Sequence, residues 1–247
     1  MPTLSRRALL LASGLGLLSA VAEAGAPGHG GDVEPELHIA SLPSTGERVV
    51  ALTFDACMGE TDERILATLV DHAIPATIFA TRRWIHRNPA ALATLLAHPD
   101  LFQIENHGDS HLPAITDQKT MFGLKTAGTI EAVRAEVAGG AAAILSATGI
   151  APRWFRGATA RYSRDAVAEI NAEGYRIAGY SLNADMGASL SAKTVARRMA
   201  AARSGDVIIA HINQPHRPAG AGVVEGILAL QQSGTRFVRL EDVATLV

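Results

Sequence analysis

The sequence predicts an α/β fold, a distorted (β/α) barrel of about seven parallel strands surrounded by helices. Short β-branched runs alternate with amphipathic stretches of helical length, and Gly or Pro stands at many junctions, as at Pro75, Gly149 and Gly174. Strands that alternate with helices in this way are parallel and are joined by right-handed crossovers. With 247 residues, 48% of them hydrophobic, the chain is long enough to bury a sizeable core.

Each expected element follows from its local pattern. The strands are the short runs rich in apolar and β-branched residues, at Val49–Phe54, Ala76–Ala80, Phe102–Glu105, Arg153–Phe155, Tyr175–Ser181, Val207–His211 and Thr235–Leu240. The helices are the amphipathic stretches between them, at Asp62–Asp71, Pro89–Ala97, Ile130–Ala147, Ser163–Ala172, Ala192–Ala202 and Val223–Gln232. Because chemistry in a barrel of this kind lies at the carboxyl ends of the strands, the polar residues there are the candidates for a site.

The N-terminal residues have the pattern of a targeting segment. Met1–Arg7 is a short basic stretch, an apolar run follows over Ala8–Ala20, and Ala22-Glu23-Ala24 is a small-x-small cleavage site. The apolar run is too short to span a bilayer comfortably. Residues 1–24 are therefore predicted to be a cleaved signal peptide, with no stable membrane anchor in the mature protein.

The signal predicts an exported protein, either periplasmic or secreted. Arg6 and Arg7 immediately before the apolar run resemble a twin-arginine signal, which exports proteins already folded. A general secretory signal that happens to contain two arginines is the alternative. Residues 25–44, rich in Gly, Pro and Glu, are expected to form a flexible N-terminal tail, and residues 45–247 the catalytic domain.

Charge and cysteine content exclude some classes of function. Lys and Arg number 22 against 24 for Asp and Glu, and no basic cluster follows Arg7, which argues against a nucleic-acid partner. Cys57 is the single cysteine, so the fold has no internal disulfide. A small buried side chain is the expected role of Cys57, and a catalytic thiol is the alternative.

Ionisable groups end five of the predicted strands. They are Asp55, His107 with His111, Arg156, Asp185 and His211. Each alone has a structural explanation, because a strand-end Asp often caps a helix and a strand-end His is often a hydrogen-bonded structural residue. The functional interpretation rests on all five falling at matching places in the fold.

Two of these histidines predict a metal site. His107 and His111 are four residues apart, so one turn of helix or a tight loop brings both imidazoles to one side. Two neutral imidazoles, a carboxylate and open water positions are typical of a hydrolytic zinc site. The expected cofactor is therefore a divalent metal, with Zn²⁺ the first choice.

The other strand-end residues predict acid–base chemistry. Asp55 is placed to accept the proton of an attacking water, and His211 to protonate a departing amine. Arg156 is expected to pair with Asp55 and orient it. Asp185 is expected to hold His211 in its protonated form.

The chain resembles a known family in five ordered segments: Thr53-Phe54-Asp55, His107-xxx-His111, Phe155-Arg156, Asp185 and Ile208-Ile209-Ala210-His211. These look like the five motifs of the polysaccharide deacetylases, carbohydrate esterase family 4. The resemblance covers about residues 48–240 and implies a distorted barrel. It also implies an N-acetylated glycan as the substrate, such as chitin, chitooligosaccharide, peptidoglycan or exopolysaccharide, or in some members an O-acetyl ester of xylan.

The resemblance also implies a role for each matching residue. Asp55 corresponds to the catalytic base and Arg156 to the residue that orients it. His107 and His111 correspond to metal ligands. Three further residues correspond to the general acid with its partner and to the oxyanion donor, namely His211, Asp185 and the backbone N–H near Thr159.

The chain departs from the family at the third metal ligand. The family usually has a second aspartate in its first motif, and this sequence has Ala56 there, which cannot bind a metal. The third ligand then comes from Cys57, Asp62, Asp109 or water, or is absent. A further alternative is that Asp55 itself turns to the metal and leaves the role of base open.

The aromatic residues that line a sugar site are also depleted. The segment Gly157-Ala158-Thr159 replaces the usual Pro-aromatic continuation of the third motif, and Met186 replaces the usual tryptophan after Asp185. Aromatic residues make up only 4% of the chain. Tyr162 is expected to supply the missing wall, so Thr159 and Tyr162 are the predicted substrate-binding residues.

The sequence is compatible with three functions. The first is removal of N-acetyl, or O-acetyl, groups from a polysaccharide or oligosaccharide by metal-activated water. The second is hydrolysis of another amide or ureide C–N bond, or of an ester, on the same barrel, which the loss of the second aspartate favours. The third is a catalytically inactive glycan-binding protein, against which the retention of Asp55, Arg156, Asp185 and His211 together argues.

Overall fold

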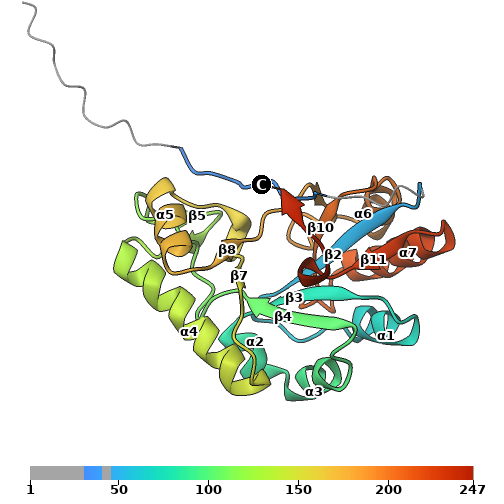
Figure 1. The fold of residues 1–247 in the computed structure, drawn as a ribbon, viewed down its shortest axis with the longest axis horizontal. Coiled ribbons are helices and arrows are strands. Elements are labelled where there is room, and N and C mark those ends of the chain that lie inside the picture. Colours follow the sequence, from blue (N-terminus) through green and yellow to red (C-terminus); the bar gives the residue numbers. More distant parts are fainter. Residues whose placement is uncertain (1–30, 41–45, 247) are drawn as a thin grey trace, which may run out of the picture.

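The structure is a computed structural model that describes residues 31–40 and 46–246. The predicted signal peptide, residues 1–24, lies outside these residues. Figure 1 shows a curled central sheet with helices packed around its outside. The strands of this sheet are β2 (Val49–Ala56), β3 (Ala76–Ala80), β4 (Phe102–Asn106), β7 (Trp154–Phe155), β8 (Arg176–Ile177), β9 (Leu182–Asn183), β10 (Val207–His211) and β11 (Arg236–Val238). The α-helices are α1 (Glu63–Asp71), α2 (Arg82–Arg87), α3 (Pro89–Ala97), α4 (Ile130–Thr148), α5 (Arg164–Ala172), α6 (Ala192–Ala200) and α7 (Ala219–Gln232).

The sheet is an incomplete parallel barrel, which confirms the predicted fold class. Its strand order is β8-β7-β4-β3-β2-β10-β9, with β11 paired to β2, and every pairing is parallel. Among the described residues no pairing joins β8 to β9, so the curl stays open between these two strands. The sequence does not predict β9 or α2, because elements this short carry too few residues to show a period. None of the helices in the described part of the chain combines the length and apolar character that a bilayer span requires.

The central strand β2 shows how the sequence positions the site. All eight residues of β2 are buried, as expected for a parallel strand covered on both faces. Thr53 and Asp55 are its polar residues, and their spacing of two places both side chains on the same face. In β10, His211 lies opposite Asp55 in the parallel register, so the ends of two neighbouring strands bring these residues together.

The described part of the predicted tail, residues 31–40, belongs to the folded domain. Its strand β1 (His38–Ile39) pairs antiparallel with β12 (Thr245–Leu246), and Leu37 is fully buried. Leu37 and Ile39 pack in a core cluster with residues of β2 and β10. This corrects the expectation of a flexible tail over these residues. Two apolar side chains in a segment rich in Gly and Pro do not by themselves predict a strand.

Candidate functional site

Arg156 fixes the position of Asp55 inside the barrel. Both side chains are buried, and the Arg156 guanidinium donates from Nη1 to Asp55 Oδ1 at 3.0 Å and to Thr53 Oγ1 at 2.9 Å. Its remaining donors reach the carbonyl oxygens of Ala178 at 3.1 Å and Gly179 at 2.9 Å. A buried guanidinium with all of these contacts is held rigidly. The structure therefore places Arg156 where it orients Asp55 through one carboxylate oxygen and leaves Oδ2 free of it.

His107 and His111 lie on a tight loop after β4 rather than on a helix. Gly108 has φ +93°, a conformation in which any other side chain would be strained, and His111 has φ 65°. The two imidazole rings lie 5.0 Å apart between centroids. His107 Nδ1 donates to the Arg156 carbonyl oxygen at 2.6 Å, which leaves its Nε2 available for a metal.

Cys57 completes a cluster with these two histidines. It is buried just beyond β2, and its Sγ lies 3.5 Å from His107 Nε2. Cys57, His107 and His111, hereafter the Cys–His–His cluster, offer ligand atoms that all lie within 4.8 Å of one another. His111 Nδ1 is buried and has no hydrogen-bond partner among the described residues. One sulfur and two imidazole nitrogens form a donor set suited to a divalent cation of the zinc type, so these residues fit the family's metal.

The other candidates for the third ligand are engaged elsewhere. Asp62 caps α1 through Arg64 N at 3.2 Å and forms an ion pair with the Arg64 guanidinium at 2.6 Å. Asp109 forms an ion pair with Arg82 and accepts a hydrogen bond from the hydroxyl of Ser110. Because both carboxylates already have cationic partners, the structure leaves Cys57 as the side chain that joins the two histidines.

Glu136 supports the site, and the sequence does not predict this role. It is buried on α4, and its Oε1 accepts hydrogen bonds from the backbone N–H groups of Ser110 at 2.9 Å and Leu112 at 3.0 Å. These bonds hold the loop on either side of His111. The signal for it was a carboxylate within the buried face of a helix, directly beside Val137.

Asp185 holds His211 through both of its carboxylate oxygens. Oδ2 accepts from the His211 backbone N–H at 2.7 Å, and Oδ1 lies 3.0 Å from His211 Nδ1. Burial disfavours the imidazolium, but the negative charge of Asp185 outweighs burial and raises the pKa of His211 well above its ordinary value. The acid partner that the sequence predicts is therefore in contact with His211.

The charges around Asp55 and Cys57 favour their ionised forms. Burial opposes ionisation of Asp55, but nearby His107, Arg156 and His211 outweigh it and lower the pKa of Asp55. Burial also opposes ionisation of Cys57, and the neighbouring histidines, His107 above all, lower the pKa of Cys57 well below its ordinary value. At neutral pH the site thus holds an ionised Asp55 facing a protonated His211, the states that a base and an acid need.

These groups open onto one cavity of about 1050 Å³. Asp55, Cys57, His111 and His211 line it, so two members of the cluster face the same space as the expected base and acid. Thr159 also lines it, with φ 70° and a buried Oγ1 that has no hydrogen-bond partner among the described residues. An unpaired polar atom at a cavity wall is available for a ligand.

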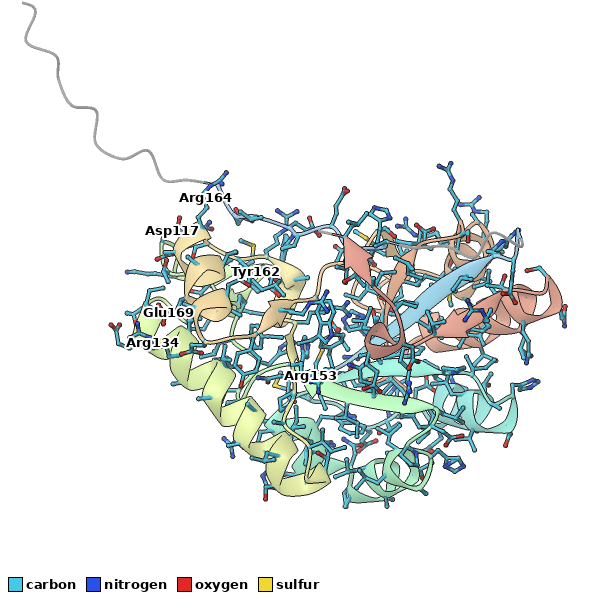
Figure 2. All side chains as sticks on the ribbon, viewed as in Figure 1. Asp117, Arg134, Arg153, Tyr162, Arg164 and Glu169 are labelled. Atoms are coloured by element: carbon cyan, nitrogen blue, oxygen red, sulfur yellow. The ribbon has the colours of Figure 1, made fainter. Side chains whose placement is uncertain are left out.

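Tyr162 does not line this cavity. Its side chain (labelled in Figure 2) is fully buried and packs in a core cluster with Phe155 and Ala166. Its hydroxyl accepts a hydrogen bond from the Gly157 N–H at 2.8 Å, and so supports the loop that carries Thr159 from beneath. This corrects the expectation that Tyr162 supplies an aromatic wall, because the ring turns into the core between β7 and α5.

The N-terminal segment reaches the cavity as well. Glu34 lines the cavity and pairs with Arg161 at 2.7 Å. The Tyr180 hydroxyl donates a hydrogen bond to the same carboxylate. The sequence does not predict that Glu34 belongs to the site, because this residue lies in a segment without periodicity.

Comparison with known proteins identifies the family. The model of the polysaccharide deacetylase family matches residues 43–178, more than half of the chain, and these contain Asp55, both loop histidines and Arg156. No curated protein sequence matches the chain.

Solved structures share the fold. A peptidoglycan N-acetylglucosamine deacetylase matches with a TM-score of 0.66 and 21% identity over 80% of this chain and 88% of that one. A peptidoglycan deacetylase of Bacillus subtilis matches with a TM-score of 0.63 and 22% identity over 80% of this chain and 90% of that one. A pseudoenzyme of carbohydrate esterase family 4 from Bacillus anthracis matches with a TM-score of 0.62 and 19% identity over 80% of this chain and 66% of that one. The family match shows that this chain belongs to the polysaccharide deacetylases, hydrolases that remove acetyl groups from glycans.

Proposed function

We propose that the protein is an active, metal-dependent deacetylase that removes N-acetyl groups from a polysaccharide or oligosaccharide. One observation carries this proposal. The expected base Asp55 is held by Arg156, and the expected acid His211 is held by Asp185. Asp55 and His211 line one cavity together with Cys57 and His111 of the Cys–His–His cluster. A protein that only binds glycans has no need of an oriented base opposite a protonated acid.

We infer a step for each of these side chains. Asp55, held through Oδ1 by Arg156, takes the proton of the attacking water on Oδ2, which lies 3.7 Å from His107 Nε2, as the water oxygen bonds to the acetyl carbon. The backbone N–H near Thr159, a residue that lines the cavity, is the donor that we expect to stabilise the negative charge on the carbonyl oxygen. His211 gives its proton to the nitrogen as the C–N bond breaks, so acetate and the free amine of the sugar leave. A divalent cation in the cluster, with Zn²⁺ expected, would polarise the carbonyl and lower the pKa of a water.

Ala56 favours a second candidate, a catalytically inactive glycan-binding protein. Among proteins of this fold one is a pseudoenzyme, so the fold alone does not establish catalysis. Acetate release separates the candidates: metal-loaded protein is incubated with chitotetraose, peptidoglycan fragments and acetylated xylan, and acetate is measured. We expect acetate and a new free amine from an N-acetylated glycan. Glycan binding without acetate from any substrate would establish the inactive protein, and hydrolysis of only non-glycan amides or ureides would establish a different hydrolase.

We further propose that Cys57 is the third metal ligand in place of the missing aspartate. Replacing Cys57 by serine should lower the affinity for Co²⁺ by more than the roughly 10- to 100-fold that loss of an outer-shell partner costs. Because Cys57 is the single cysteine, a sulfur-to-cobalt charge-transfer band in the near ultraviolet can come only from its thiolate. We expect this band in the Co²⁺-loaded wild type and its loss in Cys57→Ser.

Two variants make the ligand test specific. Asp109→Asn removes another carboxylate close to the His111 loop, and it should keep both the metal and the band, because Asp109 is paired with Arg82. Cys57→Asp restores a carboxylate ligand near this position, so it should bind Co²⁺ without the band. Cobalt bound by the wild type with no sulfur band would remove Cys57 from the ligand set.

We also propose that the protein is exported and that the mature chain begins near Gly25. The basic start, the apolar run and Ala22-Glu23-Ala24 support this proposal. N-terminal sequencing of protein from fractionated cells should find the cleaved form outside the cytoplasm, and an uncleaved cytoplasmic form would contradict it. Replacing Arg6 and Arg7 by lysine should block export by the twin-arginine route, whereas unchanged export would assign the general secretory route.

A further inference from the structure

A two-residue hairpin places an unusual residue at its tip. The strands β5 (Thr120–Met121) and β6 (Leu124–Lys125) pair through Met121 and Leu124, so Phe122 and Gly123 form the turn. Their φ angles are 48° and 81°, and a turn with both central residues in the left-handed region normally carries Asn-Gly. Phenylalanine is strained in this conformation. A strained position that persists without a folding advantage points to a function.

The Phe122 ring gains nothing from burial. Its side chain is 74% exposed, the largest exposed fraction among the large hydrophobic residues of the described chain. It lines the same cavity as Asp55 and His211. The Arg161 guanidinium lies over one face of the ring, 5.7 Å from its centre, and pairs with Glu34 at 2.7 Å. The exposure of the residue leaves the rest of the ring open at the edge of the cavity, close to a charged pair.

We propose that Phe122 is the sugar-stacking wall of this cavity and binds the apolar face of a pyranose ring of the glycan chain. The inference rests on the proposed function, because it takes the ligand to be a glycan. The C–H groups on one face of a pyranose carry partial positive charge and match the negative face of an aromatic ring. Arg161 and Glu34 supply a donor and an acceptor for the hydroxyl groups at the edge of the same ring.

The positions at which the family's sequence pattern has aromatic residues carry none in this chain. Thr159 and Met186 stand where the sequence pattern of the family has aromatic residues, and Tyr162 is turned into the core. Met186 also lines the cavity but has no aromatic face. Among the described residues that line the cavity, Phe122 and Tyr180 carry phenyl rings. Tyr180 is half-buried and packs against a core cluster, whereas Phe122 is exposed, so Phe122 offers the larger aromatic surface to a sugar.

Phe122→Asn tests the proposal without weakening the hairpin, since asparagine suits this turn position better than phenylalanine. We expect KM for chitotetraose to rise about 3- to 10-fold, the range of a lost aromatic contact, with little change in kcat. Phe122→Trp should keep wild-type KM, and Phe122→Leu, which has volume but no aromatic face, should not.

Binding measurements separate this proposal from the proposed function. Calorimetry with chitotetraose on Asp55→Asn protein, with and without Phe122→Asn, reports stacking whether or not acetate is released. Ile150→Asn is the matched control, since Ile150 is 72% exposed at the end of α4 and does not line the cavity. A Kd raised about 3- to 10-fold by Phe122→Asn, but not by Ile150→Asn, would support the stacking wall even in an inactive protein. Equal Kd values, no binding of chitotetraose to either protein, or full function in Phe122→Leu would overturn it.

Discussion

Replacing Asp55 by asparagine is expected to lower kcat for an N-acetylated oligosaccharide by about 10²- to 10⁴-fold. Asparagine keeps the size of the side chain, and its amide oxygen can still accept the hydrogen bond from Arg156 at the position of Oδ1. It has no basic oxygen for the proton of the attacking water. KM should change much less, because the base acts mainly in the transition state. Initial rates of acetate release over a range of oligosaccharide concentrations give both constants.

The fold and the metal content serve as controls for this variant. Asp55→Asn should retain its circular dichroism spectrum, and Asp109→Asn, which alters a carboxylate paired with Arg82 outside the cavity lining, should keep its activity. An amide substrate and an aryl ester should both suffer in Asp55→Asn, because each needs the attacking water. Intact acetamide hydrolysis in Asp55→Asn would mean that Asp55 is not the base. Hydrolysis of another amide or of a ureide would then be the favoured function.

Replacing His211 by alanine should have an effect of the same size on amides but not on activated esters. An amine is a poor leaving group and needs the proton of His211, so kcat for the acetamido sugar should fall by about 10²- to 10⁴-fold. An aryl oxide leaves without a proton, so the rate with an activated aryl acetate should be largely retained. The ratio of the two rates, measured on one preparation, is the decisive quantity. Equal damage to both substrates would assign His211 a structural or metal-linked role.

The pH dependence of the amide reaction tests the same residue independently. The acid must be protonated, and Asp185 raises the pKa of His211 well above its ordinary value, so activity should persist through neutral pH and fall only as pH exceeds this raised pKa. Asp185→Asn removes the charge that raises the pKa of His211. The alkaline limb of the profile should therefore shift to lower pH in this variant. An alkaline limb at the same pH in Asp185→Asn would show that His211 is not the group whose titration limits activity.

The sequence predicts those parts of the fold and site that depend on local pattern. Strand period and strand-end position predict the buried apolar run of β2 with Asp55 at its end. The spacing of His107 and His111 likewise predicts that they lie together, without knowledge of the tertiary structure. The sequence does not predict which residue joins the two histidines as the third candidate ligand. The choice among Cys57, Asp62 and Asp109 depends on which of these side chains already has a partner. The ion pairs of Asp62 with Arg64 and of Asp109 with Arg82 are seen only in the folded chain.

Two further features cannot be predicted from the sequence for related reasons. Glu136 on α4 contacts the His111 loop, which is distant in sequence, and the local pattern around Glu136 does not indicate this contact. The hairpin that carries Phe122 has strands of two residues each, too short for alternation to show. The position of Tyr162 near the third motif predicts a residue of the substrate groove, but the direction of a side chain after a loop depends on φ angles such as the 70° of Thr159, which the sequence does not show.

The pairing of β1 with β12 ties together the two ends of the described domain. His38 lies opposite Leu246, and each of the two strands has only two residues. A short pair of terminal strands belongs to the parts of a domain that open most easily. The segment that carries Glu34 precedes β1, whereas Asp55 and Arg156 are buried in the barrel. Local opening of the β1–β12 pair should therefore disturb the edge of the cavity at Glu34 before it disturbs the Asp55–Arg156 pair, so glycan binding is expected to be more sensitive than the acid–base groups to loss of either end.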